Sequence, residues 1–174
     1  MAKTYKSTRK SYPVNPPEDN YQVEDAFVPI SAPIPNPLNF ISNLLGLAPS
    51  LQTDIQFIEA SRKGIKKSAL DKLTSKLGIT QEKMCKLLHM STRTYQRLKA
   101  DEALDVFTSE QAIEMAQVLE KAQAVFDSDI TVKQWLQTPS LALGGVAPLD
   151  FLDTRFGSKM VLNTLGRIEH GVYA

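Results

Sequence analysis

Residues 80–99 read TQEKMCKLLHMSTRTYQRLK and contain two short helical patterns with two residues between them. The stretches Thr80–Leu88 and Ser91–Lys99 each begin with a favoured N-cap residue, so we expect a helix over each. His89 and Met90 then form the turn, and histidine is among the residues that tolerate the left-handed backbone such a turn needs. This spacing predicts a helix-turn-helix within an all-α fold.

The second helix of this motif has one face suited to packing and one suited to reading DNA. Cys85 is small enough to accept this helix, while Met90, Tyr95 and Leu98 supply inward anchors. Arginine can bond bidentately to guanine and glutamine to adenine, and threonine can reach base edges or phosphates. We therefore expect DNA contacts from Thr92, Arg93, Thr94, Gln96, Arg97 and Lys99, and phosphate contacts from Lys66, Lys67, Lys83 and Lys86.

Charge is distributed unevenly along the chain, although the formal net charge is only +1. Residues 62–99 contain eleven Lys and Arg against Asp71 and Glu82, whereas residues 100–130 contain eight acidic residues against Lys121. Such a basic segment is typical of a protein that binds a polyanion. The simpler interpretation is the solvated face of a helical bundle.

The residues give no support for catalytic or metal-binding chemistry. Cys85 is the only cysteine, and the only histidines, His89 and His170, have no ligand partners at metal-binding spacing. The sequence contains no glycine-rich phosphate loop after a strand and no nucleophile with a suitable base. We expect neither an enzyme nor a cofactor-binding protein.

The sequence also favours a cytoplasmic protein without a membrane segment. A single thiol suits a reducing compartment. No apolar run approaches the ~18 residues of a membrane span. The charged start at residues 1–10 is not followed by the apolar region of a secretory signal.

Proline divides the first part of the chain from the second. Residues 1–48 contain most of the ten prolines, which predicts an extended or disordered extension. This extension is either a solvated tail or an arm that becomes ordered on a partner. Residues 49–107 form the predicted helix-turn-helix domain, with one helix beginning near Ser50 and another capped by Ser68.

Residues 108–174 form a predicted small helical domain. Thr108 with Gln111 predicts a capping box at its first helix, with Phe107 packing onto Ala112. Further along, we expect helix starts at Thr131 and Pro148, a break at Gly157, a core stripe of Val161, Leu165 and Ile168, and a helix end at His170 and Gly171.

Several strings in the second half of the chain form a specific pattern. Residues 142–145 read ALGG, residues 148–150 read PLD and residues 165–174 read LGRIEHGVYA. Together with RTYQRLK at residues 93–99, they resemble the Xre/MbcA/ParS antitoxin family over residues 64–174. The C-terminal string is specific to that family, whereas many regulators share the helix-turn-helix part.

The resemblance implies a type II antitoxin made of two parts, an Xre-like helix-turn-helix that represses its own operon and a helical toxin-binding domain. The implied partners are operator DNA and a RES-domain toxin that depletes NAD, whose active-site cleft the antitoxin would cover. We expect a homodimer within a toxin–antitoxin hetero-oligomer, because a two-fold symmetric dimer gains affinity by binding both half-sites of an operator.

Candidate toxin contacts are the polar and terminal residues near the C-terminus, because the apolar stripe of the last helix suits a core. Arginine and tyrosine are frequent interface anchors, and a chain end can enter a cleft. The candidates are Arg167, Glu169, His170, Tyr173 and Ala174.

Two features depart from the family pattern. Residues 1–48 lie outside the resemblance, and Gln111, Ala112 and Glu114 stand where we expect Glu, Ser and Arg. Polar contacts of that helix are therefore not transferred from the family. The alternatives are a helix-turn-helix transcriptional repressor whose C-terminal domain only dimerises or binds a ligand, and an interaction protein that no longer binds DNA.

Overall fold

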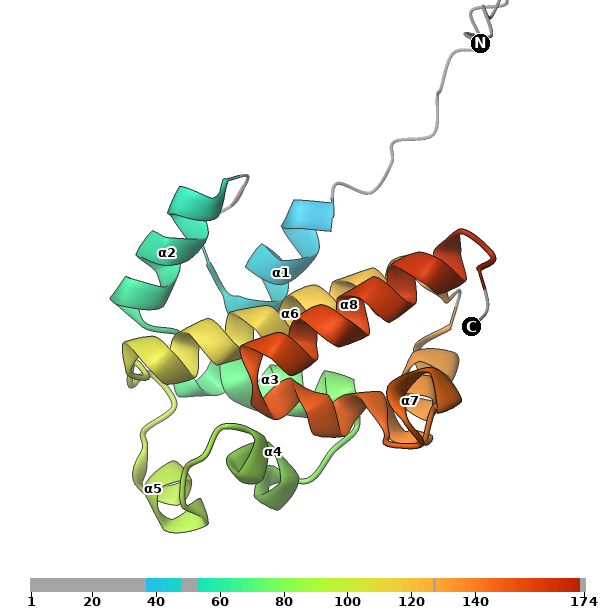
Figure 1. Ribbon diagram of the computed structural model, residues 1–174. Coiled ribbons are helices and arrows are strands. Elements are labelled where there is room, and N and C mark those ends of the chain that lie inside the picture. Colours follow the sequence, from blue (N-terminus) through green and yellow to red (C-terminus); the bar gives the residue numbers. More distant parts are fainter. Residues whose placement is uncertain (1–36, 48–52, 127, 173–174) are drawn as a thin grey trace, which may run out of the picture. The chain divides into compact units, whose positions relative to one another are not determined.

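Helices make up the regular structure of the residues that the computed structural model describes, which are 37–47, 53–126 and 128–172 (Figure 1). The β-type pairings in these ranges are isolated bridges, one between Lys66 and Ala103 and one between Ser140 and Val146. The all-α prediction is confirmed. In chain order the elements are α1 (Pro37–Leu45), α2 (Asp54–Lys63), α3 (Lys67–Leu77), α4 (Gln81–Leu87), α5 (Thr92–Arg97), α6 (Val106–Val125), α7 (Asp129–Gln137), the 3₁₀ helices η1 (Leu141–Leu143) and η2 (Pro148–Asp153), and α8 (Arg155–Glu169).

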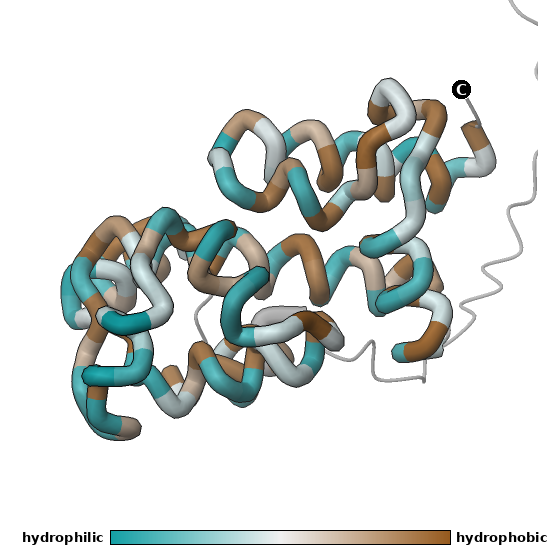
Figure 2. Tube along the Cα trace, turned by 90° about the horizontal axis from the view of Figure 1, so that it is seen from below, coloured by the Kyte–Doolittle hydropathy of each residue, from teal (hydrophilic) through white to brown (hydrophobic). Residues whose placement is uncertain are grey.

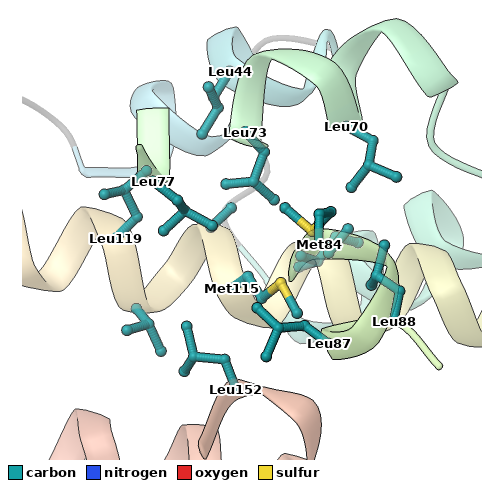
Figure 3. Packing of buried hydrophobic residues seen from close by; sticks show 14 of the residues in the cluster. Leu44, Leu70, Leu73, Leu77, Met84, Leu87, Leu88, Met115, Leu119 and Leu152 are labelled. Carbon is teal, nitrogen blue, oxygen red and sulfur yellow. The ribbon is translucent and has the colours of Figure 1, made fainter. Parts of the chain in front are cut away.

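Helix α6 lies at the centre of the fold and contacts α1, α2, α3, α7, α8 and η2. Its buried side chains, among them Ala112, Met115 and Val118, cover a broad face of the helix. The remaining side is polar and carries Glu110, Glu114 and Lys121. Figure 3 shows leucines of α3 on one side of α6 and Leu152 of η2 on the other. A broad apolar face needs several packing neighbours. The described residues all belong to one compact unit.

The predicted division between residues 107 and 108 falls in the first turn of α6. This helix packs against α2 and α3 before the division and against α7, η2 and α8 after it. Both parts of the chain therefore bury side chains in one hydrophobic core. The division into two functional domains stays a prediction.

Helix α1 corrects the expectation that all of residues 1–48 are extended or disordered. Pro37 occupies the first helical position, where a missing N–H costs no hydrogen bond. Ile41, Leu44 and Leu45 follow helical spacing and are buried where α1 packs on α3 and α6. Burial of such side chains is worth about 1.5–3 kcal/mol each, which outweighs the local preference for extended chain. The expectations for residues 1–36 lie outside the described residues.

Helix α3 starts two residues before the predicted position. Lys66 is its N-cap and makes no side-chain cap bond, so Ser68 lies in the first turn instead of capping it. Backbone carbonyls of the loop that follows α5 instead accept hydrogen bonds from the free N–H groups at the start of α3. Lys67 N–H donates to the carbonyl of Glu102 over 3.0 Å, and Ser68 N–H donates to that of Ala100 over 2.9 Å.

The starts of α6 and α7 also lie upstream of the predicted residues. Asp105 caps α6 and accepts from the backbone N–H of Thr108 over 3.0 Å, so Thr108 is not the N-cap. Ser128 caps α7 and accepts from Ile130 N–H over 3.2 Å, so Thr131 lies inside that helix. In both cases another short polar side chain stands three residues before the predicted cap and reaches the free N–H groups first.

The sequence predicted a helix break at Gly157. The structure differs, because Gly157 lies buried inside the first turn of α8. A Cβ atom at this position would come within 1.9 Å of the Phe151 carbonyl oxygen. The glycine therefore allows η2 to approach the first turn of α8 closely. Thr154 caps α8 by accepting from Gly157 N–H over 3.1 Å. The predicted helix end at His170 and Gly171 is confirmed.

Hydrophobic and hydrophilic positions alternate along the helices, as Figure 2 shows. Helix α2 departs from the usual amphipathic arrangement, because it covers α6 with the small residues Ala60 and Ser61 and leaves Ile55 68% exposed. Phe107, which was expected to pack onto Ala112, is also exposed. Single exposed apolar side chains are common on protein surfaces.

Candidate functional site

The helix-turn-helix predicted from residues 80–99 is formed by α4 and α5. Thr80 caps α4 by accepting from Lys83 N–H over 3.2 Å, and Ser91 caps α5 by accepting from Thr94 N–H over 3.0 Å. His89 adopts a left-handed conformation with φ of 52° between them. Caps and turn therefore agree with the sequence prediction.

Tyr95 fixes α5 to the rest of the fold. Its side chain is only 1% exposed, and its hydroxyl donates to Asp71 Oδ1 of α3 over 2.5 Å. Burial, together with this hydrogen bond, raises the pKa of Tyr95 well above its usual range. Lys67 completes the cluster, with its ammonium 2.9 Å from the Asp71 carboxylate and 5.0 Å from the centre of the Tyr95 ring.

The residues expected to contact DNA lie on the outer side of α5 and just after it, and all of them are exposed. Arg93, Arg97 and Lys99 have no ion-pair partner among the described residues. Thr94 is partly committed to the helix start, because its hydroxyl lies 2.8 Å from that of Ser91. The structure thus brings three unpaired cations together beside Thr92 and Gln96. Their contact with DNA remains a prediction.

Three of the four lysines expected to contact phosphates are in ion pairs within the chain. Lys67 pairs with Asp71, Lys83 pairs with Asp150 of η2, and Lys86 pairs with Glu82 over 3.1 Å. Lys66 is exposed and has no partner in the part of the chain that the structure describes. Exposed ion pairs contribute only about 0–1 kcal/mol, so a phosphate can compete for Lys83 and Lys86.

A polar seam joins the helix-turn-helix to η2. The side-chain amide of Gln111 on α6 donates toward the carbonyls of Leu87, Leu152 and Asp153, at 2.6, 3.2 and 2.8 Å. The His89 ring nitrogen lies 2.9 Å from the same Asp153 carbonyl. Sequence reasoning treated Gln111 as half of a capping box and missed this role. Gln111 stands where the family pattern has Glu, and this difference could have indicated a separate role for its side chain.

The described candidates for toxin contact lie at the end of α8. Arg167, Glu169 and His170 are exposed, and Glu169 pairs with Lys121 of α6 over 2.5 Å. The hydrogen bond from Lys121 holds the pKa of the Glu169 carboxyl below its usual value. Tyr173 and Ala174 lie outside the described residues.

An open groove of about 380 Å³ lies beside these residues. The rings of Phe126 and Trp135 form part of its wall, with centroids 5.5 Å apart. Ile168 was expected in the core but is only half-buried and lines the groove, because the last turn of α8 extends past the packed part of the fold. Other lining residues are Leu141, Arg167 and Val172.

Within the described ranges, no three His, Cys, Asp or Glu side chains lie close enough together to hold a metal ion. Cys85 is buried behind α5 as predicted, and burial raises the pKa of its thiol. None of the described helices combines the length and the apolar character needed to span a membrane.

Comparison with known families matches both parts of this structure. The antitoxin Xre-like helix-turn-helix domain matches residues 56–117, and the antitoxin Xre/MbcA/ParS C-terminal toxin-binding domain matches residues 121–171. The two matches together cover more than half of the 174 residues and meet within α6.

Individual relatives agree with these matches. A Prs ADP-ribosylating antitoxin of Sphingobium sp. is 29% identical over 123 residues, which are 65% of this chain and 77% of the relative. An antitoxin Xre of Photorhabdus laumondii is 28% identical over 113 residues, 63% of this chain and 75% of the relative. An antitoxin Xre of Pseudomonas putida is 27% identical over 123 residues, 71% of this chain and 77% of the relative.

Proposed function

Because this chain belongs to the Xre/MbcA/ParS antitoxin family, we propose that it is a type II antitoxin that neutralises a RES-domain, NAD-depleting toxin and represses its own operon. The antitoxin role itself follows from the two matched domains, neither of which is enzymatic. The class of toxin, the coverage of its active site and autorepression are the parts that we propose.

Operator binding is the first proposed activity. The observation that supports it is the set of unpaired cations on and after α5, held in place by the buried Tyr95. Arg93 and Arg97 have the chemistry to bond guanine edges, and Gln96 that to bond adenine. A homodimer would present two such helices to the half-sites of a two-fold operator in the cytoplasm.

Toxin neutralisation is the second proposed activity, and we assign it to the end of α8 and the residues after it. Arg167, Glu169 and His170 are exposed there beside an apolar groove. Tyr173 and Ala174 continue the chain from this point and could enter the active-site cleft of a toxin. Burial of an aromatic side chain with a polar tip is a frequent source of interface affinity.

The name of the Sphingobium relative supports a second candidate for the toxin, an enzyme that ADP-ribosylates Prs. Co-expression with the product of the adjacent gene tests both candidates. We expect the chain to restore growth and to co-purify with that product. A fall in cellular NAD without modified Prs supports the RES-domain assignment, whereas an ADP-ribose adduct on Prs supports the second candidate.

A matched deletion tests where neutralisation occurs. Removal of Val172–Ala174 should abolish growth rescue and leave an operator gel shift intact, because these residues lie beyond α8. Growth rescue by the truncated chain would exclude the tail as the inhibitory segment. A chain that shifts operator DNA but never rescues growth would favour a repressor without a toxin.

A further inference from the structure

Helix α8 buries one face and leaves two large apolar side chains exposed outside that face. Val161, Thr164 and Leu165 lie on the buried face, against α6. Outside this face, Phe156 is 86% exposed and Met160, one turn later, is 47% exposed. A single exposed apolar side chain is ordinary, but two neighbours on one helix are typical of a contact surface.

A second exposed phenylalanine stands at the start of α6. Phe107 is 82% exposed, and Glu110, one turn further along α6, pairs with Arg155 of α8. Arg155 directly precedes Phe156, so this ion pair places the first turn of α8 near the first turns of α6. Helices α6 and α8 run in parallel, since Lys121 and Glu169 pair near their other ends. We call Phe107, Phe156 and Met160 the phenylalanine patch.

Arg155 and Gly157 link the first turn of α8, which carries Phe156, to α6 and η2. Arg155 also pairs with Glu114 over 3.0 Å, so it joins the first turns of α8 to two successive turns of α6. Gly157 packs against the backbone of η2 directly behind Phe156. Rings presented by a fixed backbone lose little conformational entropy on binding, which favours their use as anchors.

The charges beside the patch indicate which partner suits it. Lys159 and Arg167 are exposed on the same side of α8 and have no ion-pair partner among the described residues. Among the carboxylates near the patch, Glu110 and Glu114 pair with Arg155, and Asp105 accepts hydrogen bonds from Thr108. A second copy packed on this patch would bring unpaired cations toward unpaired cations. DNA would suit the cations but leave the rings without an apolar seat.

We propose that the phenylalanine patch is the anchor by which the toxin docks, and that the toxin receives it in an apolar pocket rimmed by carboxylates. The proposal rests on the proposed function and extends its contact surface from the end of α8 to the first turns of α8 and α6. Phe107 belongs to the segment that matches the helix-turn-helix family and Phe156 to the toxin-binding segment. In this proposal, the docked toxin therefore contacts both matched segments.

Pull-down and titration of the full chain with the adjacent gene product test this proposal. Phe156→Ser and Phe107→Ser should each weaken the complex by about 30-fold or more, as expected for central aromatic anchors. Lys159→Glu should weaken it less, with a loss that shrinks as salt is added. The matched control is Ile55→Ser on α2, an exposed apolar residue outside the patch, which should leave affinity unchanged.

The outcomes separate this inference from the proposed function. If the unaltered chain does not bind the product, the proposed function and this inference both fail. If the unaltered chain binds and the two serine variants bind equally well, the patch is not the anchor and the proposed function stands. Before binding is measured, the unfolding midpoint and the mass in solution of each variant are compared with those of the unaltered chain. A change of oligomeric state with Phe156→Ser would make the patch a self-association surface and overturn the proposal.

Discussion

Lys67 and Arg97 are both basic residues of the helix-turn-helix region, yet their surroundings differ. Lys67 is held by the Asp71 carboxylate and lies over the Tyr95 ring, so its charge is largely balanced within the fold. Arg97 is exposed in the last turn of α5 and has no ion-pair partner among the described residues. In the proposed operator complex, the attraction for DNA is therefore expected to come mainly from the unpaired cations.

For Arg97→Ala, we expect a loss of about 1–3 kcal/mol in operator binding if the guanidinium reads a base. Binding to unrelated DNA should fall much less, because that binding is the sum of many contacts with phosphates and the variant loses only one of them. Gel shifts at fixed salt with the chain's own promoter region and with a scrambled sequence measure the difference. Arg167→Ala on α8 is the matched control. Equal losses on both DNAs would assign Arg97 to phosphate contact.

Gly157 and Gly166 provide a matched pair on α8, because both lie within the helix but only one is crowded. Gly157→Ala would place Cβ 1.9 Å from the Phe151 carbonyl oxygen and should reduce the free energy of unfolding by roughly 3 kcal/mol. At Gly166 a Cβ meets no atom within 4 Å, so Gly166→Ala should be neutral or stabilise by up to ~1 kcal/mol. Urea unfolding of both variants tests the comparison. Similar values for the two would contradict the packing seen at Gly157.

At the scale of elements, a partly buried carboxyl group lies where α1 packs on α6. Glu120 of α6 has one carboxylate oxygen that is buried without a hydrogen-bond partner. Burial raises the pKa of Glu120 to about 7, although the backbone N–H of Ile41 in α1 acts in the opposite direction. The folded protein therefore holds a proton on Glu120 that the unfolded chain releases at lower pH.

This difference predicts that stability falls as the pH rises from about 4.5 to about 7, because over that range the folded state binds more protons than the unfolded state. Glu120→Gln should flatten this part of the profile. At pH 8 the Glu120→Gln substitution should raise the free energy of unfolding by about 1 kcal/mol. The expected gain is this small because the Glu120 carboxyl is partly exposed to solvent. Asp101→Asn, at an exposed carboxylate, is the control. Parallel profiles for Glu120→Gln and the unaltered chain would show that Glu120 ionises normally.

On the scale of the whole molecule, two functions share one core. Helix α6 packs against elements on both sides of the predicted division. The seam from Gln111 and His89 to η2, and the pair of Lys83 with Asp150, join the two sides again at the surface. Separate unfolding of the two sides would expose the broad buried face of α6 to water, which is unfavourable for its apolar side chains.

We therefore expect one cooperative unfolding transition for the described part of the chain. Trp135 is the only tryptophan and lies against Phe126, so its fluorescence reports on the C-terminal side. Far-UV circular dichroism reports on all helices, including α4 and α5. The two signals should give the same urea midpoint and slope. Two separate midpoints would show that the sides are independent domains despite the shared helix.

The helix-turn-helix could be located from the sequence because short-range contacts determine it. Thr80 and Ser91 bond to N–H groups three residues away, and His89 adopts the turn conformation that its type tolerates. The apolar spacing of α5 likewise predicted that Tyr95 would be buried and Arg97 exposed. Such features depend on neighbours within one or two helical turns.

Only the tertiary structure decided the features that depend on distant segments. Gln111 bonds to the carbonyl of Leu152, 41 residues away, and nothing near it in the sequence indicates that partner. Gly157 is required by the backbone of η2, and α1 is helical because α3 and α6 bury its apolar face. The phenylalanine patch forms because the buried face of α8 packs against α6, which brings the first turns of the two helices together. Burial and close approach depend on which elements meet in space, and local sequence does not contain that information.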